Sequence, residues 1–274
     1  MEVHKVCRAF AGVNVRAVTL GEMTASSNST RDALLNLTTE LIGLAEARGT
    51  SLRALGGLGI DLRATGVNPM LRREFADIDV AAPRKARRQL TEVMEEAGLQ
   101  GEPEFNALQG ARRQIWWTPD RSTHVDVFLG EFRMCHRLDF DGRLGVDHPA
   151  LPAADLLLTK LQVLELNRKD VTDVAALLTT HGLDEGDEAG SINRHRIVDV
   201  LSTDWGFYTT ATDNLERIPG LVSEIDPELG RQVAEAAGKL HDDVARAPKS
   251  RAFKLRAKVG RRKRWYEVPD ESIT

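Results

Sequence analysis

The feature that most restricts the possible folds of this chain is a change of pattern near residue 150. Before it, short stretches alternate apolar and polar residues, as strands do: FADIDVAA, RQIWW, THVDVFL and, more weakly, residues 136–140. Helical patterns separate these stretches. After residue 150 only helical patterns follow. The sequence therefore predicts an α/β fold, a mixed sheet with flanking helices, followed by an all-helical C-terminal domain.

Residues that favour helix ends give the expected bounds of the helices. A helix is expected over residues 31–47, with Ser29 or Thr30 as its N-cap. The glycine- and proline-containing stretch 100–111 is expected to be a linker. Further helices are expected at about residues 58–66, 83–97, 153–180 with a break near 168–170, 193–202, 205–217 and 228–246.

Composition places the chain among ordinary soluble proteins, with 42% hydrophobic and 28% charged residues. No run of about 18 apolar residues occurs, and no signal-peptide core is present near the N-terminus, so we expect neither a membrane span nor secretion. Cys7 and Cys135 lie far apart and without metal-ligand spacing. This argues against a zinc site or a disulfide framework and favours a cytoplasmic location.

Charge is distributed very unevenly along the chain. Residues 249–264 contain nine Lys or Arg and no acid, so the net charge of −4 combines +9 there with −13 on the remainder. A basic segment on an acidic body favours a polyanionic partner, although a solvated extension has the same composition. The alternation from Phe253 to Val259 fits a strand, and the spacing of Leu255 and Val259 also fits a helix.

Two aspartates in the stretch FADIDVAA are candidates for metal ligands. In a strand, Asp77 and Asp79 point to the same face, because side chains repeat every two residues. Magnesium in proteins typically binds one or two carboxylates together with substrate phosphates. Two ions about 3.5–4 Å apart can stabilise both the attacking and the leaving oxygen of a displacement. Taken alone, the pattern also fits a strand with an acidic exposed face.

The context of these aspartates favours a site. Gly56 and Gly57 lie roughly 20 residues upstream, before a short helix. Glycines there let backbone N–H groups approach phosphate oxygens. Asp126 lies among apolar residues in HVDVFL, where an unpaired carboxylate is costly. We therefore predict one site from the glycine turn and from Asp77, Asp79 and Asp126, with a structural turn and an edge-strand carboxylate as the alternatives.

Two groups of motifs resemble a known family. The order LGG, ADIDV and HVDVF resembles the polymerase-β-like nucleotidyltransferase superfamily, with a glycine pair, a DxD strand and a third acid. The segment LLLTKLQVLELNRKDVTDVAALL is similar to the later motifs of the AbiEii/MenT-type nucleotidyltransferases, toxins of toxin–antitoxin and phage-defence pairs. Those motifs combine a helix-borne lysine with Arg-x-Asp-x-x-Asp, matched here by Lys160, Arg168, Asp170 and Asp173. The resemblance covers roughly residues 31–180.

The resemblance implies a nucleotidyltransferase-type fold and an enzymatic activity. The implied reaction transfers a nucleotide from an NTP and releases pyrophosphate, with two Mg²⁺ ions held by Asp77, Asp79 and Asp126. Some family members modify the 3′ end of tRNA, so RNA, and in particular tRNA, is the expected acceptor. The toxin family also implies an antitoxin protein as a partner.

The later motifs are expected to supply charge to the nucleotide. Lys160 offers a compact cation for the leaving pyrophosphate, and Arg168 can bind phosphate with two N–H groups. Asp173 is expected in the catalytic set, whereas Asp170 is expected to cap the following helix. The alternative for Lys160 is a solvated helix face.

The chain divides into four expected parts: an N-terminal extension over 1–30, a nucleotidyltransferase domain over 31–150, a helical domain over 151–247 and a basic tail over 248–274.

Two other functions compete with transfer to RNA: transfer to a small-molecule or protein hydroxyl, and a non-catalytic nucleic-acid or partner-binding module. The tail cations expected to bind RNA are Lys254, Arg256, Lys258, Arg261, Arg262, Lys263 and Arg264.

Three further residues are weaker candidates. His124 shares a strand face with Asp126 and is expected to be structural. Arg72 and Arg73 precede the aspartate strand and are expected to extend a nucleic-acid surface.

Overall fold

The computed structural model describes the backbone of residues 20–268 and the side chains of residues 30–268, so most of the predicted N-terminal extension lies outside the described residues. The central sheet has five strands: β1 (Arg53–Leu55), β2 (Ile78–Ala82), β3 (Gln100–Gly101), β4 (Arg113–Trp117) and β5 (His124–Leu129). Their order is β1-β2-β5-β4-β3, with β2 and β5 parallel and every other pair antiparallel. The predicted fold class, a mixed sheet with flanking helices and a helical C-terminal region, is confirmed.

The two faces of the sheet contact different helices. Alternate residues of the central strands, such as Ile78 and Val127, pack with α1 (Leu20–Ala47) and α3 (Arg87–Glu96) in one buried cluster. The intervening residues face the other way, where Ala81 and Phe128 join a second cluster with α2 (Gly56–Arg63) and α5 (Ala153–Leu161). The period of two along each strand therefore places Asp79 and Asp126 on the face that α2 and α5 cover.

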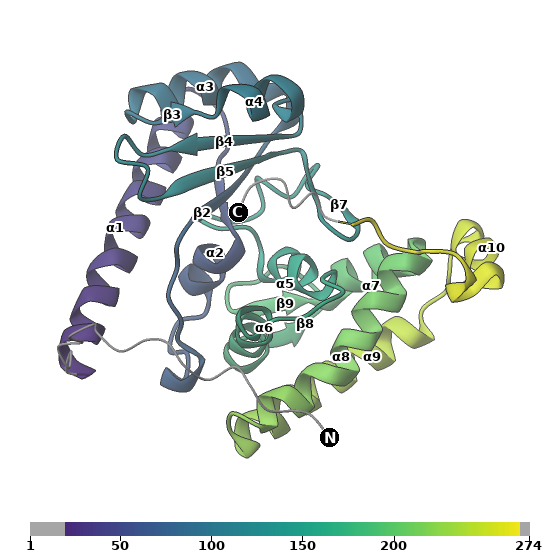
Figure 1. Cartoon of the computed structure of the whole chain (residues 1–274). Coiled ribbons are helices and arrows are strands. Elements are labelled where there is room, and N and C mark those ends of the chain that lie inside the picture. Colours follow the sequence, from purple (N-terminus) through teal and green to yellow (C-terminus); the bar gives the residue numbers. More distant parts are fainter. Residues whose placement is uncertain (1–19, 269–274) are drawn as a thin grey trace, which may run out of the picture.

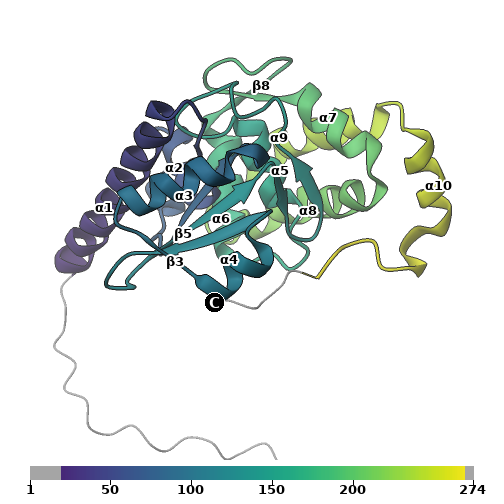
Figure 2. The same cartoon turned by 90° about the horizontal axis from the view of Figure 1, so that it is seen from above.

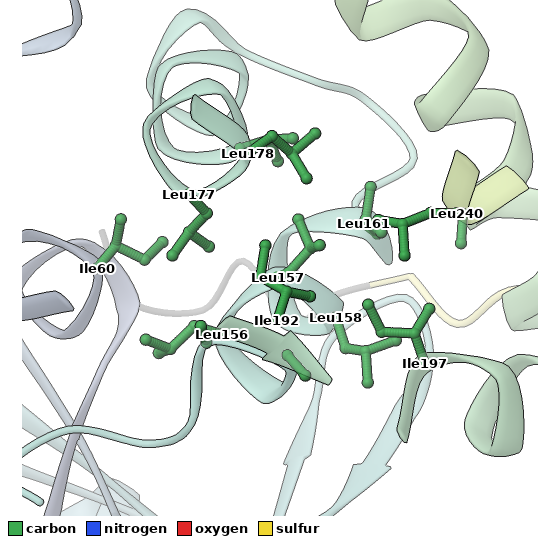
Figure 3. Close-up of a cluster of buried hydrophobic side chains, with 14 of the residues drawn as sticks. Ile60, Leu156, Leu157, Leu158, Leu161, Leu177, Leu178, Ile192, Ile197 and Leu240 are labelled. Atoms are coloured by element: carbon green, nitrogen blue, oxygen red, sulfur yellow. The ribbon is translucent and has the colours of Figure 1, made fainter. Parts of the chain in front are cut away.

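The second buried cluster continues from the sheet into the C-terminal helices. Figure 3 shows Ile60 of α2 near leucines of α5 and α6 (Arg168–Thr180), with Ile197 and Leu240 from the later helices close by. Those later helices are α7 (Arg194–Thr203), α8 (Trp205–Ser223) and α9 (Pro227–Arg246). Two small sheets, β6–β7 (Glu131–Arg133 with Arg137–Asp139) and β8–β9 (Gly182–Asp184 with Ser191–Asn193), complete this part.

Three sequence predictions about element bounds were wrong. The first helix begins at Leu20 rather than near residue 31, so Ser29 and Thr30 lie inside it. No proline interrupts that segment, and its polar residues are tolerated in a helix. The expected linker 100–111 contains β3 and α4 (Pro103–Gln109), because a proline typical of loops also favours the first turn of a helix.

The third correction concerns the helical break, which spans residues 162–167 instead of 168–170. Asn167 ends it and caps α6 by accepting a hydrogen bond of 3.0 Å from the Asp170 N–H. The Asp170 carboxylate accepts a hydrogen bond from the Asn167 N–H in return. Asp170 was predicted to be the N-cap, but Asn167 is the N-cap and Asp170 is the third helical residue, which completes the capping box from inside α6.

The basic tail forms a helix, α10 (Arg251–Val259), followed by a 3₁₀ turn over Gly260–Arg262. Ser250 caps α10, and buried Phe253 packs against Tyr208 of α8. Beyond the turn, the Trp265 indole donates a hydrogen bond of 3.2 Å to the Thr210 hydroxyl. The tail is therefore a docked helix rather than a strand, and in both views it lies at the opposite end of the molecule from α1 (Figures 1 and 2).

Within the described part of the chain, every helix is too short or too polar to span a lipid bilayer.

Candidate active site

Two of the three predicted carboxylates lie on adjacent strands. Asp79 in β2 and Asp126 in β5 are partners in the parallel register, so their side chains project from the same face. Asp77 is exposed and directly precedes β2, although the sequence placed it within the strand. It is close enough to Asp79 for its negative charge to raise the pKa of the Asp79 carboxyl.

The glycine turn lies directly against Asp79. Gly56 begins α2 immediately after β1 and has φ of +59°, which favours glycine. A Cβ atom built at this position would overlap the Asp79 carboxylate. Any larger residue would therefore displace either the turn or the carboxylate. The N-terminus of α2 brings the partial positive charge of its N–H groups to the same place.

Asp79 is the least compensated charge in this group. Among residues 30–268, whose side chains the structure describes, its carboxylate has no hydrogen-bond or ion-pair partner. Burial raises the pKa of Asp79, and the negative charges of Asp77 and Asp126 raise it further, to about 7. A cation bound at this carboxylate would relieve both effects.

Asp126 is compensated within the protein. Its two oxygens accept hydrogen bonds of 2.9 and 2.8 Å from Nε and Nη2 of Arg113. The His124 ring lies 3.5 Å from one of them. Burial alone would raise the pKa of Asp126, but the contacts with His124 and Arg113 outweigh it and lower the pKa. His124 therefore contacts a carboxylate of the candidate site, and its expected structural role stays a prediction.

Sequence reasoning missed Arg113. It begins β4 and lies two residues before Ile115, which pairs with Asp126 across the strands. Arg113 is thus a diagonal neighbour of Asp126 on the same face, within reach of a long side chain. The stretch RQIWW predicts a strand that begins with Arg113, but only the register of this strand against β5 shows that Arg113 lies beside Asp126.

A second group of charges joins α5 and α6. The Lys160 ammonium lies 2.9 Å from Asp173 and 3.1 Å from Asp170. Burial would lower the pKa of Lys160, but these two carboxylates raise it. The Lys160 charge in turn lowers the pKa of Asp79, so the cation lies close to the carboxylate group. This largely buried position differs from a solvated helix face.

Arg73 is the second cation that sequence reasoning missed as a site residue. Its Nε and Nη2 donate hydrogen bonds of 2.7 and 2.8 Å to the two oxygens of Asp173. The guanidinium lies against the glycine turn, because a Cβ atom on Gly57 would overlap it, and it stacks on the Phe75 ring. Nothing in the sequence distinguishes Arg73 from its exposed neighbour Arg72.

Arg168 lies apart from these contacts. It is exposed in the first turn of α6, and within the described residues its side chain has no hydrogen bond or ion pair.

Several of the predicted tail cations are engaged within the protein. Arg256 donates hydrogen bonds to the carbonyls of Gly260 and Lys263 and lies over the Trp205 ring. Arg261 pairs with Asp213 at 2.7 Å. The other predicted cations are exposed: Lys254, Lys258, Arg262, Lys263 and Arg264.

The carboxylates fit a metal ion unequally. Asp77 and Asp79 are hard oxygen donors that form no ion pair with any described side chain, and they suit a divalent ion such as Mg²⁺. Both Asp126 oxygens, by contrast, are bound to Arg113. In the part of the chain with described side chains, residues 30–268, no three His, Cys, Asp or Glu side chains are grouped so that they could hold a metal ion. The predicted site of three ligands stays a prediction.

Comparisons with known proteins add one structural likeness. No family model and no curated protein matches the chain. The solution structure of the antibiotic-resistance factor ANT(2'')-Ia matches 85% of this chain and 97% of its own length. The sequence identity is 15% and the TM-score is 0.34, and a likeness at this level assigns neither an activity nor a substrate.

Proposed function

We propose that this protein is a magnesium-dependent nucleotidyltransferase that transfers a nucleotide from an NTP and releases pyrophosphate. One observation carries the proposal: the Asp79 carboxylate, which has no hydrogen-bond or ion-pair partner among residues 30–268, lies directly against the glycine turn at Gly56. A triphosphate with its metal ion is the substrate that needs both groups together. Glycine supplies close approach to the phosphates, and the carboxylate supplies a ligand for the ion.

The remaining residues have separate roles in this proposal. Mg²⁺ held by Asp77 and Asp79 would neutralise charge on the triphosphate. Backbone N–H groups of Gly56 and Gly57 bind phosphate oxygens. Lys160 and Arg73 stabilise the negative charge that develops on the leaving pyrophosphate. Asp173 contacts both cations and thereby positions them.

RNA is the proposed acceptor, with the 3′ end of tRNA as the specific candidate. The exposed cations of the tail support a polyphosphate partner. The resemblance to the AbiEii/MenT-type toxins supports tRNA and suggests an antitoxin partner. Transfer to a small-molecule hydroxyl is the second candidate. It is favoured by the internal contacts of Arg256 and Arg261, which reduce the number of cations free for phosphate.

The decisive experiment combines the purified protein, Mg²⁺, each α-labelled NTP and total RNA. Label on RNA, formed only with Mg²⁺, is the expected result. Label on an added aminoalcohol or protein hydroxyl, but not on RNA, would favour the second candidate. Absence of pyrophosphate release with every NTP and every acceptor would contradict the enzymatic proposal and leave a non-catalytic binding module.

We expect Lys160→Ala to weaken NTP binding and slow turnover without altering RNA binding. The ammonium contacts Asp170 and Asp173 next to the proposed triphosphate position and lies far along the chain from the basic tail. Removal of one charge-assisted contact is expected to reduce turnover by about 10²–10³-fold. Titrations with NTP and with RNA measure the two effects separately. If the Lys160→Ala variant had the same NTP affinity and turnover as the parent, Lys160 would have a purely structural role.

For the tail, we expect the triple variant Lys254→Gln, Lys258→Gln and Arg262→Gln to weaken RNA binding. Each phosphate of a single strand that the variant no longer neutralises should reduce the slope of log K against log salt by about 0.7, or about 2 for all three. The matched control changes Arg231, Lys239 and Arg246 of α9 to Gln, since these exposed cations are already paired with neighbouring acids. Equal slopes in the two variants would contradict an RNA-binding tail.

A further inference from the structure

The contacts of Arg113 hold its guanidinium close to the carboxylates of Asp77, Asp79 and Asp126. Nε and Nη2 form a two-point contact with Asp126, which is buried at 4% exposure. The guanidinium carbon lies 5.5 Å from the centre of the Phe105 ring and 5.4 Å from that of Phe128. Strand pairing of β4 with β5 sets the position of the backbone. Arg113 is therefore held in place and not freely mobile in solvent.

This arrangement affects all three aspartates. The charges of Asp126, Asp79 and Asp77 each raise the pKa of Arg113, which places one permanent positive charge among three negative ones. The Arg113 charge also lowers the pKa of Asp79. An arginine stays protonated at any physiological pH, so this compensation is always present.

Arg113 competes for the oxygens that a second metal ion would need. An ion bridging Asp79 and Asp126 requires at least one Asp126 oxygen, and both of these accept hydrogen bonds from the guanidinium. Asp77 and Asp79 have no such partner within the described residues. The site therefore offers one open pair of carboxylates and one carboxylate that is already neutralised.

We propose that Arg113 acts as a built-in cation at the third carboxylate, so that the site binds one divalent ion per chain instead of two. This inference rests on the proposed function and differs from the expectation of two ions that the family resemblance gave. The single ion is held by Asp77 and Asp79, and Arg113 holds Asp126 in place of the second ion.

The number of bound Mn²⁺ ions tests this proposal directly. Mn²⁺ alone is titrated into the full-length protein, and free Mn²⁺ is followed by electron paramagnetic resonance. The parent is expected to bind one ion. Arg113→Gln releases the Asp126 carboxylate and is expected to bind two, whereas Arg113→Lys keeps the positive charge and is expected to bind one.

Two controls separate charge from structural damage. In Arg113→Gln with Asp126→Asn the second site lacks the Asp126 carboxylate that it requires, so one ion is expected again. Arg112→Gln removes the exposed arginine next in sequence and should leave one ion bound. A melting curve with and without Mn²⁺ accompanies each titration. We expect Mn²⁺ to raise the melting temperature of Arg113→Gln more than that of the parent, because the ion replaces the missing counter-charge.

The possible failures are distinguishable. Two ions on the parent would overturn the role of Arg113 and leave the proposed transferase function intact. One ion on both the parent and Arg113→Gln, with the variant folded, would also overturn it. Absence of Mn²⁺ binding by the parent would contradict the metal dependence of the proposed function together with the inference.

Discussion

Replacement of Asp79 by asparagine is expected to abolish nucleotidyl transfer and to leave the fold intact. The asparagine side chain keeps the shape that packs against Gly56 but has no negative charge to bind a metal ion. Loss of one preorganised electrostatic interaction typically costs about 10²–10³-fold in turnover, and loss of a metal ligand is expected to cost at least that much. Release of labelled pyrophosphate, measured over a range of Mg²⁺ concentrations, gives the result.

The stability of the same variant provides the second half of this prediction. Asp77 and Asp126 both repel the Asp79 charge, and burial disfavours it as well. Removal of that charge is therefore expected to leave the melting temperature unchanged or to raise it. Asp199→Asn, on the exposed face of α7, serves as the matched control and should alter neither activity nor stability. Near-parent turnover of Asp79→Asn would show that the carboxylate is structural.

The sequence predicted the parts of the fold and site that depend on local pattern. The alternation in FADIDVAA and THVDVFL placed Asp79 and Asp126 correctly in strands, since side-chain period follows directly from backbone geometry. The glycine pair before α2 was likewise visible, because few residues tolerate a positive φ. Burial of Lys160 was not predicted, although its helix has apolar residues on most sides.

The missed residues depend on contacts between distant segments. Arg73 and Asp173 are 100 residues apart in the chain, and Arg113 and Asp126 are 13 apart across a strand pair. Their recognition requires the register of β4 against β5 and the packing of α6 against the loop before β2. No periodicity within either segment contains that information.

The tail illustrates the same limit for secondary structure. Its pattern fitted a strand and a helix equally, and tertiary contacts decided between them. Phe253 packs under α8, and the Glu267 N–H donates a hydrogen bond of 2.9 Å to the Cys135 carbonyl. These contacts hold both ends of the segment against the body, where a short amphipathic helix is stabilised by packing rather than by propensity.

The helical part of the molecule contains a buried charge network that ties it together. Asp155 of α5 is fully buried and accepts hydrogen bonds of 2.7 Å from Arg143 and 2.9 Å from Arg196 of α7. Arg143 also contacts Asp187 through two hydrogen bonds of 2.9 and 2.7 Å. Burial lowers the pKa of Arg143, but these contacts outweigh it and raise the pKa. One carboxylate thus links α5, α7 and the loop before α5.

We expect Asp155→Ala to destabilise the protein by about 3–5 kcal/mol, because it leaves two largely buried arginines without their shared carboxylate. Urea unfolding followed by circular dichroism measures the change. Glu235→Ala is the control, since it breaks an exposed pair with Lys239 and should cost about 0–1 kcal/mol. A quadruple variant, Asp155→Leu with Arg143→Met, Arg196→Met and Asp187→Asn, should recover much of the stability, because it leaves no member of the network as an uncompensated charge. A change below about 1 kcal/mol in Asp155→Ala would show that water compensates the arginines and that the network does not hold these elements together.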